Sequence, residues 1–497
     1  MNKIILLLFL FFISPNIFFS QNNPETKRVY WESVHNITVT GIDALYNFKF
    51  KEAEEKFDEV IKIAPADPRG HFFKAMIYHY RYTFLRVRTD FDKFIQLSDN
   101  VIDAAGKVLD KDKNNSNAMF YLGGIYGYRG IVRSQENQIV RAVWDGRKGY
   151  SYLENAIEAN LNNHDAEMGL GMFNYFVSRI PSSFRWMIKI MGFNGDRQKG
   201  LEQLERAAAK GTYAKNEAKW WLSQFYVAEE QPERAFKFLN ELADKYTQNP
   251  FYLQRYGNIL LYWLRRADEA IVVLKKAITI QNSEAERFIS TSYSSLSDAY
   301  RFKNNFTESI QWGQKYVSSK DIDSSAKDYT YYRIGLCYEL LGDRTTAIQN
   351  YQRAGKNTDA QERIKAPLTY ADIILVKMSN NFEAGDYQDV IKSANELMTI
   401  SSLNEDQRGE KYFRIGRAYF ELGNFDNAIE MFGQVLQIKN FKQNWILPNT
   451  HYRLGLAQLK VGNKQKAKKE FKTALKFKDY TGERRIKYGI ESELDKL

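Results

Sequence analysis

Few residues in this chain have the types and spacings that catalysis or metal binding requires. Cys337 is the one cysteine, and no histidine lies near it in sequence, so we expect a buried core thiol and no internal disulfide. His71 and His79 are eight residues apart on roughly one face of an expected helix, but no third ligand accompanies them. No nucleophile–base pair or carboxylate pair stands out either. We therefore predict no catalytic residue, no metal site and no cofactor, in a protein that is not an enzyme.

Two further patterns have both a chemical and a structural interpretation. Gly169 and Gly171 could begin a phosphate-binding loop, but the third glycine and the preceding strand are missing. We expect these glycines to belong to tight packing between helices. Arg81, Arg86 and Arg88 lie among aromatic residues, a pattern that can bind nucleic acid. The export signal described below disfavours that partner, so we expect arginines that lie along packed helices with their charged ends in water.

The elements that position these residues repeat along the chain. In three blocks a glycine is followed twelve residues later by an alanine, and an aromatic residue follows four residues after that. Small residues let two helix backbones approach closely, and the rings fill the seam beside them. The pairs are Gly335 and Ala347, Gly416 and Ala428, and Gly455 and Ala467. This pattern resembles the tetratricopeptide repeat, a helix–turn–helix unit of about 34 residues. One such unit cannot bury its apolar face alone, so the resemblance implies a stack of units.

Length and composition fit such a stack. The 497 residues are 44% hydrophobic and 15% aromatic with 9 prolines, which suits a chain made mostly of packed helices. We predict an all-α fold, an α-α superhelix (solenoid) of about eleven helical hairpins with helical insertions in the N-terminal half. The expected segments are a signal peptide at 1–20, divergent repeat-like helices at 21–115, stretched units with insertions at 116–215, a regular array at 216–480 and a C-terminal capping helix at 481–497.

The stretched region carries a second resemblance. From about Ala118 to Tyr226 it resembles a family that includes tetratricopeptide repeat protein 39, the fungal inclusion body clearance protein and exported bacterial relatives. The resemblance implies fold and family, and no reaction. The matching features are Gly169-Leu170-Gly171, Phe173, Tyr175, Pro181, Gly192-Phe193, Gly195-Asp196 and Gly200-Leu201.

The first residues predict export. Lys3 precedes an apolar run from Ile4 to Ile13, Ser14-Pro15 interrupts it, and Ser20 is a small residue before an expected cleavage site. An uncleaved anchor is the alternative, because Phe18 is a poor residue three positions before that cut. No cysteine stands directly after the apolar run. We therefore predict a bacterial protein that is periplasmic or associated with the outer envelope, and that is not a lipoprotein.

Aromatic residues recur at one position of the expected first helices, three residues before the glycine or small residue of each unit. First helices line the concave face of stacked repeats of this kind, so we predict a groove for an extended peptide or a helix of a partner protein. The alternative is that the rings pack between adjacent first helices. The candidate groove residues are Trp220, Tyr332, Phe413 and Tyr452, with Arg417 and Phe420 on the same strip.

A second candidate surface is the apolar segment 182–193. It forms either a lid on the solenoid or an exposed helix that enters a membrane interface or a partner's groove. Its apolar residues are Phe184, Trp186, Met187, Ile190 and Met191. The net charge of +11 is spread along the chain, which leaves a weak preference for acidic partners or anionic lipid.

These patterns favour a scaffold over a reaction centre. We predict an exported protein that mediates protein–protein interactions in the cell envelope, with protein or peptide partners and no nucleic acid. The alternative is a membrane- or lipid-associated repeat protein that docks through 182–193.

Overall fold

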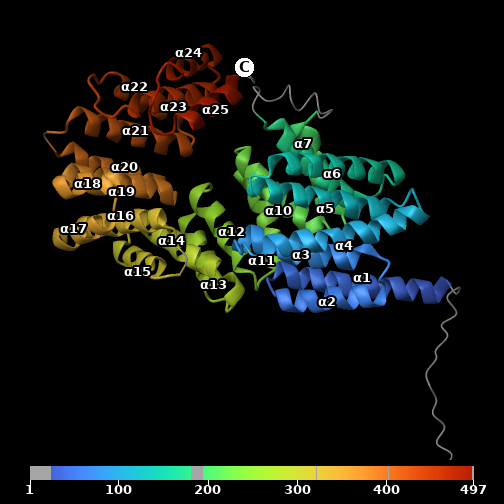
Figure 1. Ribbon diagram of the computed structural model, residues 1–497. Helices are drawn as coiled ribbons and strands as arrows, with labels where there is room; N and C mark the ends of the chain where they lie inside the picture. The colour runs from blue at the N-terminus through green and yellow to red at the C-terminus, as the bar shows by residue number, and fades with distance from the viewer. Residues whose placement is uncertain (1–23, 181–193, 321, 401, 495–496) are drawn as a thin grey trace, which may run out of the picture. The chain divides into compact units, whose positions relative to one another are not determined.

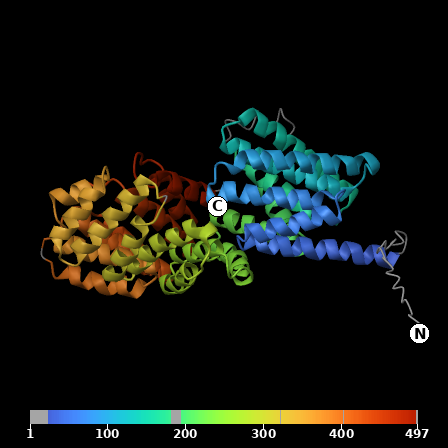
Figure 2. The ribbon, with the colours of Figure 1, turned by 60° about the horizontal axis from the view of Figure 1, so that its bottom comes forward.

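Helices follow one another in antiparallel pairs throughout the described chain. The computed structural model describes residues 24–180, 194–320, 322–400, 402–494 and 497. These residues contain 24 α-helices and no strand, and the helices form eleven successive pairs. Within each part of the chain, neighbouring pairs lie side by side (Figures 1 and 2). The predicted all-α superhelix of about eleven hairpins is confirmed.

The chain divides into two compact units, one up to Lys215 and one from Asn216 onward. The first unit holds four helix pairs, and long first helices pack both on their partners and on the next pair. Its helices are α1 (Pro24–Tyr46), α2 (Phe50–Ile63), α3 (Pro68–Leu85), α4 (Asp90–Lys111), α5 (Ser116–Gln135), α6 (Ile139–Ala159), α7 (His164–Ser178) and α9 (Arg197–Lys210).

The second unit holds seven pairs and two additional helices. The additional helices are α18, which follows the fourth pair of this unit, and the C-terminal α25. The unit contains α10 (Lys215–Ala228), α11 (Pro232–Lys245), α12 (Pro250–Tyr262), α13 (Ala267–Ile278), η2 (Ser283–Ala285), α14 (Glu286–Phe302), α15 (Phe306–Val317), α16 (Ser324–Leu340), α17 (Arg344–Arg353), α18 (Thr358–Lys365), α19 (Tyr370–Ala384), α20 (Tyr387–Met398), α21 (Glu405–Glu421), α22 (Phe425–Leu436), α23 (Ile446–Lys460), α24 (Lys464–Ala474) and α25 (Glu483–Leu494).

Short polar side chains set where many helices begin. The amide or carboxylate oxygen of such a residue accepts a hydrogen bond from a backbone N–H of the first turn, which has no partner inside the helix. Asn115 accepts from the Ala118 N–H at 3.0 Å, and Asn249 from the Phe251 N–H at 2.8 Å. Asp196 accepts from the Lys199 N–H at 3.0 Å and caps α9 in the same way.

The turns inside the pairs share one backbone feature. In ten of the eleven pairs, a residue with positive φ lies between the two helices. Gly385 shows why some of these positions need glycine, because its φ is +92° and an added Cβ would collide with the carbonyl oxygen of Arg265. The ten residues are Phe48, Arg86, Asn137, Glu230, Arg265, Asn304, Gly342, Gly385, Gly423 and Gly462.

The recurring glycines make room for a ring that the sequence places sixteen residues later. A Cβ added at Gly416 would lie 2.7 Å from the Phe432 ring, and one at Gly335 would lie 2.6 Å from the Tyr351 ring. The same relation joins other pairs, including Gly41 with Phe57 and Gly455 with Phe471. An aromatic side chain of the second helix therefore occupies the space beside the glycine of the first helix. The alanine that lies between them in sequence is fully buried.

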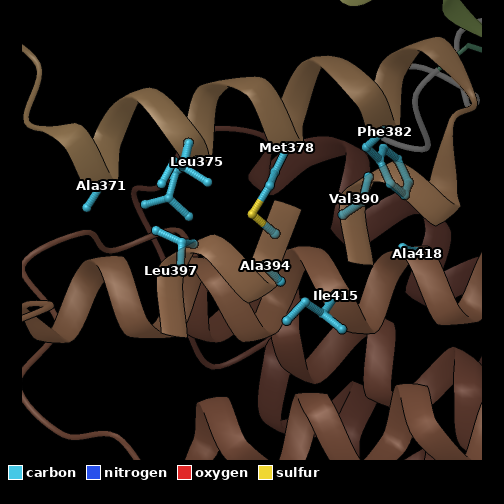
Figure 3. Packing of buried hydrophobic residues seen from close by; sticks show 10 residues of the cluster. Ala371, Leu375, Met378, Phe382, Val390, Ala394, Leu397, Ile415 and Ala418 are labelled. Carbon is cyan, nitrogen blue, oxygen red and sulfur yellow. The ribbon is translucent and has the colours of Figure 1, made fainter. Parts of the chain in front are cut away.

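In the second unit, clusters of buried apolar side chains extend from one pair into the next. Between α19, α20 and α21, side chains of all three helices point into one cluster (Figure 3). Met378 from α19, Val390 from α20 and Ala418 from α21 are all fully buried there. Because residues of neighbouring pairs pack into one cluster, a single pair does not form a complete core.

The extra residues of the third pair lengthen both of its helices. This pair lies in the region 116–215 that was predicted to carry insertions, and its helices α5 and α6 are 20 and 21 residues long. Glycines let the two backbones touch, since a Cβ at Gly149 would lie 2.9 Å from the Gly123 carbonyl oxygen. The result is a long hairpin, with its turn at 136–138.

Within the described part of the chain, no helix combines the length and the apolar character needed to cross a bilayer.

Candidate functional site

The predicted groove residues come from the first helices of four pairs in the second unit, and two of them are buried. The Trp220 ring packs against Phe251, with ring centroids 4.7 Å apart. The Phe413 ring packs against Trp445 and Phe432 at 5.5 and 6.1 Å. These two rings belong to the core, as the packing alternative describes, and are not open to a partner.

The other aromatic groove residues are partly buried. Tyr332 lies 6.1 Å from Tyr351, and burial raises the pKa of its phenol to about 12. Tyr452 lies 6.2 Å from the Phe471 ring. Phe420 packs on Phe425 at 5.4 Å. These rings contact the second helix of their own pair, and a binding role for them stays a prediction.

Arg417 is the predicted groove residue with the most unusual surroundings. Its guanidinium carbon lies 3.7 Å from the centroid of the Phe382 ring, and its nearest carboxylate, Glu383, is 3.6 Å away. Arg265 approaches the same ring at 4.7 Å and the same carboxylate at 3.5 Å. Two cations therefore share one ring and one carboxylate. Such sharing is costly unless a further negative charge is present.

A third arginine, Arg453 of α23, completes this group, which we call the arginine cluster (Arg265, Arg417 and Arg453). Among the described residues Arg453 forms no ion pair or hydrogen bond, and its guanidinium lies 5.8 Å from the Tyr452 ring. Glu383 and Glu421 are the carboxylates that act on the cluster, and both contact Arg265. Two carboxylates thus face three guanidinium groups.

The three arginines differ in their electrostatics. Burial acts to lower the pKa of Arg265, but Glu383 and Glu421 outweigh it and raise that pKa. Burial, and next to it the positive charge of Arg453, lowers the pKa of the Arg417 guanidinium well below its usual range. Burial also lowers the pKa of Arg453, and Arg265 acts in the same direction. The Nε atoms of Arg265 and Arg417 are buried without a hydrogen-bond partner among the described residues. An anionic group placed here would relieve repulsion and use donors that are otherwise unpaired.

Two arginines at equivalent positions elsewhere in the array are neutralised. Arg333 of α16 forms an ion pair with the buried Asp298, which also accepts hydrogen bonds from Arg301 at 3.1 Å and the Tyr262 hydroxyl at 2.8 Å. Arg414 is paired with Glu410 on its own helix. Arg255 of α12 also has no carboxylate partner among the described residues, and burial lowers its pKa while its guanidinium lies 5.5 Å from the Phe251 ring. The arginine cluster differs in that three guanidinium groups share two carboxylates.

The neighbourhood of the cluster is open to solvent at the end of α12. Tyr262 and Trp263 are both exposed, and the Arg485 guanidinium of α25 lies 6.0 Å from the Trp263 ring. Desolvation by the surrounding protein nevertheless raises the pKa of Tyr262 well above its usual range.

The sequence pattern contained a signal for this site. In three units the residue directly after the recurring aromatic is arginine, namely Arg333, Arg414 and Arg453. The spacing could not show which of the three lacks a carboxylate. Arg265 lies in a turn, outside the repeating positions, and only the fold brings it beside Arg417.

The residues that were considered for catalysis or metal binding lie among packed side chains. Cys337 is buried, burial raises the pKa of its thiol, and Ser309 lies 3.5 Å from its sulfur. His79 is buried, and burial lowers its pKa to about 3. His71 is half-buried on the same helix, and no group of three metal-ligating side chains occurs among the described residues.

The two patterns with alternative interpretations also lie in packed helices. Gly169 and Gly171 are inside α7, where an added Cβ would lie 2.6 Å from Leu153 and 2.7 Å from the Gly200 carbonyl oxygen respectively. This geometry is the expected close packing of helices. Arg81 pairs with Asp90 at 2.7 Å, and Arg88 pairs with Glu136. Arg86 is exposed at the end of α3.

The predicted lid or membrane segment lies outside the described residues. This concerns Phe184, Trp186, Met187, Ile190 and Met191.

Comparison with known families agrees with the helix pairs. Residues 411–441 and 448–479 match the family model of the tetratricopeptide repeat. The chain is a tetratricopeptide-repeat protein. Residues 154–357 also match the model of the Iml2/tetratricopeptide repeat protein 39 family, so this tetratricopeptide-repeat protein resembles that family. The match begins later than the predicted resemblance and extends much further into the second unit. Repeats of this type indicate a scaffold for protein–protein interaction.

Several solved structures match this chain at low sequence identity and low TM-score. A tetratricopeptide repeat protein from Parabacteroides merdae is 16% identical, covering 56% of this chain and 97% of its own, with a TM-score of 0.26. The P58(IPK) TPR domain is 12% identical, covering 93% and 97%, with a TM-score of 0.21. Human IFIT1, in a dimer with PPP-AAAA, is 15% identical, covering 82% and 93%, with a TM-score of 0.32.

Proposed function

We propose that this tetratricopeptide-repeat protein is a non-enzymatic scaffold that binds an acidic segment of a partner protein at the arginine cluster. The observation that supports this function is the shortage of negative charge there, with Glu383 and Glu421 facing Arg265, Arg417 and Arg453. A glutamate or aspartate side chain of a partner would supply the missing carboxylate. The exposed Tyr262 and Trp263 beside the cluster would contact the apolar parts of that segment.

Binding of an oligoglutamate peptide to the purified chain tests this function. We expect saturable binding in fluorescence polarisation that weakens as salt is added, and no binding of an oligolysine peptide of equal length. A hydrogen bond to a charged group contributes about 1.5–3 kcal/mol, so Arg453→Met should weaken binding about tenfold or more.

A matched variant separates the site from the overall charge. Lys392→Met removes one positive charge from the exposed face of α20 and should leave peptide binding unchanged. Arg453→Met should keep or raise thermal stability, since it removes a half-buried, desolvated cation that has no paired carboxylate. The proposal is wrong if the peptide does not bind, or if both variants bind it equally well.

We further propose that residues 1–20 direct export to the periplasm or the outer envelope, as their pattern of charge and apolar residues supports. Cell fractionation and the intact mass of the protein test this. Recovery in the envelope fraction with a mass that begins at Gln21 is expected. A cytosolic chain that retains Met1 would contradict it.

A further inference from the structure

In the first two turns of α6, the side that faces α5 carries small and charged residues, and the side that faces solvent is apolar. The side of the helix that faces α5 carries Ala142, Asp145 and Gly146, of which Asp145 is buried and pairs with Arg133. In an ordinary helix hairpin the apolar stripe faces the partner and the polar residues face water. Here small and charged residues fill the inner side, because glycines bring the two backbones too close for large side chains.

The outer side of the same two turns is apolar and exposed. Ile139, Val140, Val143 and Trp144 are 55, 72, 40 and 60% exposed, and their spacing places them together on one side of α6. Single exposed apolar residues are ordinary, but four adjacent ones on one helix mark an interaction surface. We call these four residues the α6 patch.

Cations border the α6 patch, and the nearby carboxylates are already paired. Arg147 and Lys148 follow Trp144 by three and four residues, and Arg141 precedes it by three. The Lys148 ammonium lies 5.1 Å from the ring of Tyr126 on α5 and its side chain remains exposed. All three side chains are exposed, and none forms an ion pair among the described residues. Asp145 is paired with Arg133, and Glu136 at the hairpin turn is paired with Arg88.

We propose that the α6 patch docks the protein on an anionic lipid surface. Val140 and Trp144 would enter the headgroup region, while Arg147 and Lys148 would contact lipid phosphates. This surface is separate from the arginine cluster and does not depend on the proposed scaffold function. A second copy of the chain fits less well, because a two-fold contact would bring these cations against their own equivalents.

Vesicle flotation of the purified full chain tests this docking. We expect flotation with phosphatidylcholine vesicles that contain phosphatidylglycerol, little flotation with phosphatidylcholine alone, and a decrease at high salt. Arg147→Gln with Lys148→Gln should weaken binding roughly thirtyfold, from the contribution of each cation near an anionic surface. Val140→Ser with Trp144→Ser should weaken it by about tenfold or more.

Matched controls use apolar residues that are as exposed but lie outside the patch. Leu161→Ser and Val272→Ser should float as the unchanged chain does. All of these side chains are on the surface, so the circular dichroism melting curves of the variants should agree with that of the unchanged chain. Agreement would exclude unfolding as the cause of any lost flotation. Brominated lipid should quench the fluorescence of the unchanged chain more than that of Trp144→Phe.

Three results would overturn the proposal. One is the absence of flotation with either vesicle. Another is flotation that is lost in Trp186→Ser with Met187→Ser but kept in the α6 variants, which would assign lipid contact to segment 182–193. The last is a concentration-dependent dimer in light scattering that Val140→Ser with Trp144→Ser abolishes, which would make the patch an interface between copies.

Discussion

Replacing Gly416 by alanine tests the packing rule that joins the two helices of each repeat. The added Cβ would lie 2.7 Å from Cε1 and 2.8 Å from Cδ1 of Phe432, so the ring or the backbone of α21 must move. Overpacking of this kind costs about 1–3 kcal/mol, whereas alanine in place of glycine inside a helix contributes about 1 kcal/mol. We therefore expect the free energy of unfolding to stay unchanged or to fall by up to ~2 kcal/mol.

The same substitution at Gly433 is the control, because it lies in α22 directly after Phe432. No atom lies within 4 Å of a Cβ added at Gly433, so only the gain in helix propensity remains. We expect Gly433→Ala to raise the free energy of unfolding by about 1 kcal/mol. The two glycine-to-alanine changes in one helix pair should thus differ by about 1–3 kcal/mol in their effect on the free energy of unfolding.

A double-mutant cycle with Phe432→Leu assigns the cost to the ring. The smaller side chain leaves room for the new Cβ, so Gly416→Ala should cost less in the Phe432→Leu background than alone. Urea unfolding followed by circular dichroism gives the four free energies. The packing rule fails if Gly416→Ala stabilises the chain as much as Gly433→Ala does. It also fails if the effects of Gly416→Ala and Phe432→Leu on the free energy of unfolding add within about 0.3 kcal/mol.

Three further predictions concern other parts of the structure. Gly462 has a φ of +80° and free space around it, so Gly462→Ala should lower the free energy of unfolding by about 1 kcal/mol through backbone strain alone, and an unchanged urea midpoint would contradict this. Burial lowers the pKa of His79 to about 3 from an ordinary value of about 6.5, so its neutral form contributes stability that is complete above about pH 6.5 and is lost as the pH falls toward 3. His79→Phe should flatten the dependence of the unfolding free energy on pH in that range, and an unchanged slope would contradict the assignment. The buried Cys337 thiol should react slowly with a disulfide reagent in the native protein and rapidly in urea, whereas fast native labelling would mean that it is accessible.

The sequence was sufficient for the helix pairs because the repeat is a local pattern. The twelve-residue interval from Gly416 to Ala428 lies within one pair, and the interactions that it reports are between adjacent helices. The role of the glycine was only partly predicted. Close backbone approach was expected, while the structure shows that the Phe432 ring takes the place of the missing Cβ.

The candidate sites depend on relations that no local pattern contains. Arg265 reaches Arg417 because the α12–α13 turn meets the end of α19, a contact between residues more than a hundred positions apart. The α6 patch could not be predicted from the sequence for another reason. Ile139 and Trp144 look like ordinary core residues in sequence, and only the close approach of α5 to α6 turns them outward.

Hydrogen–deuterium exchange of the chain with and without the oligoglutamate peptide tests the scaffold account most directly. The account predicts that the peptide slows exchange in the C-terminal turns of α12 and α19 and around Arg417 and Arg453 in α21 and α23. It also predicts that this protection disappears in Arg453→Met. Protection confined to the exposed second helices, or equal protection in Arg453→Met, would contradict a binding site at the arginine cluster.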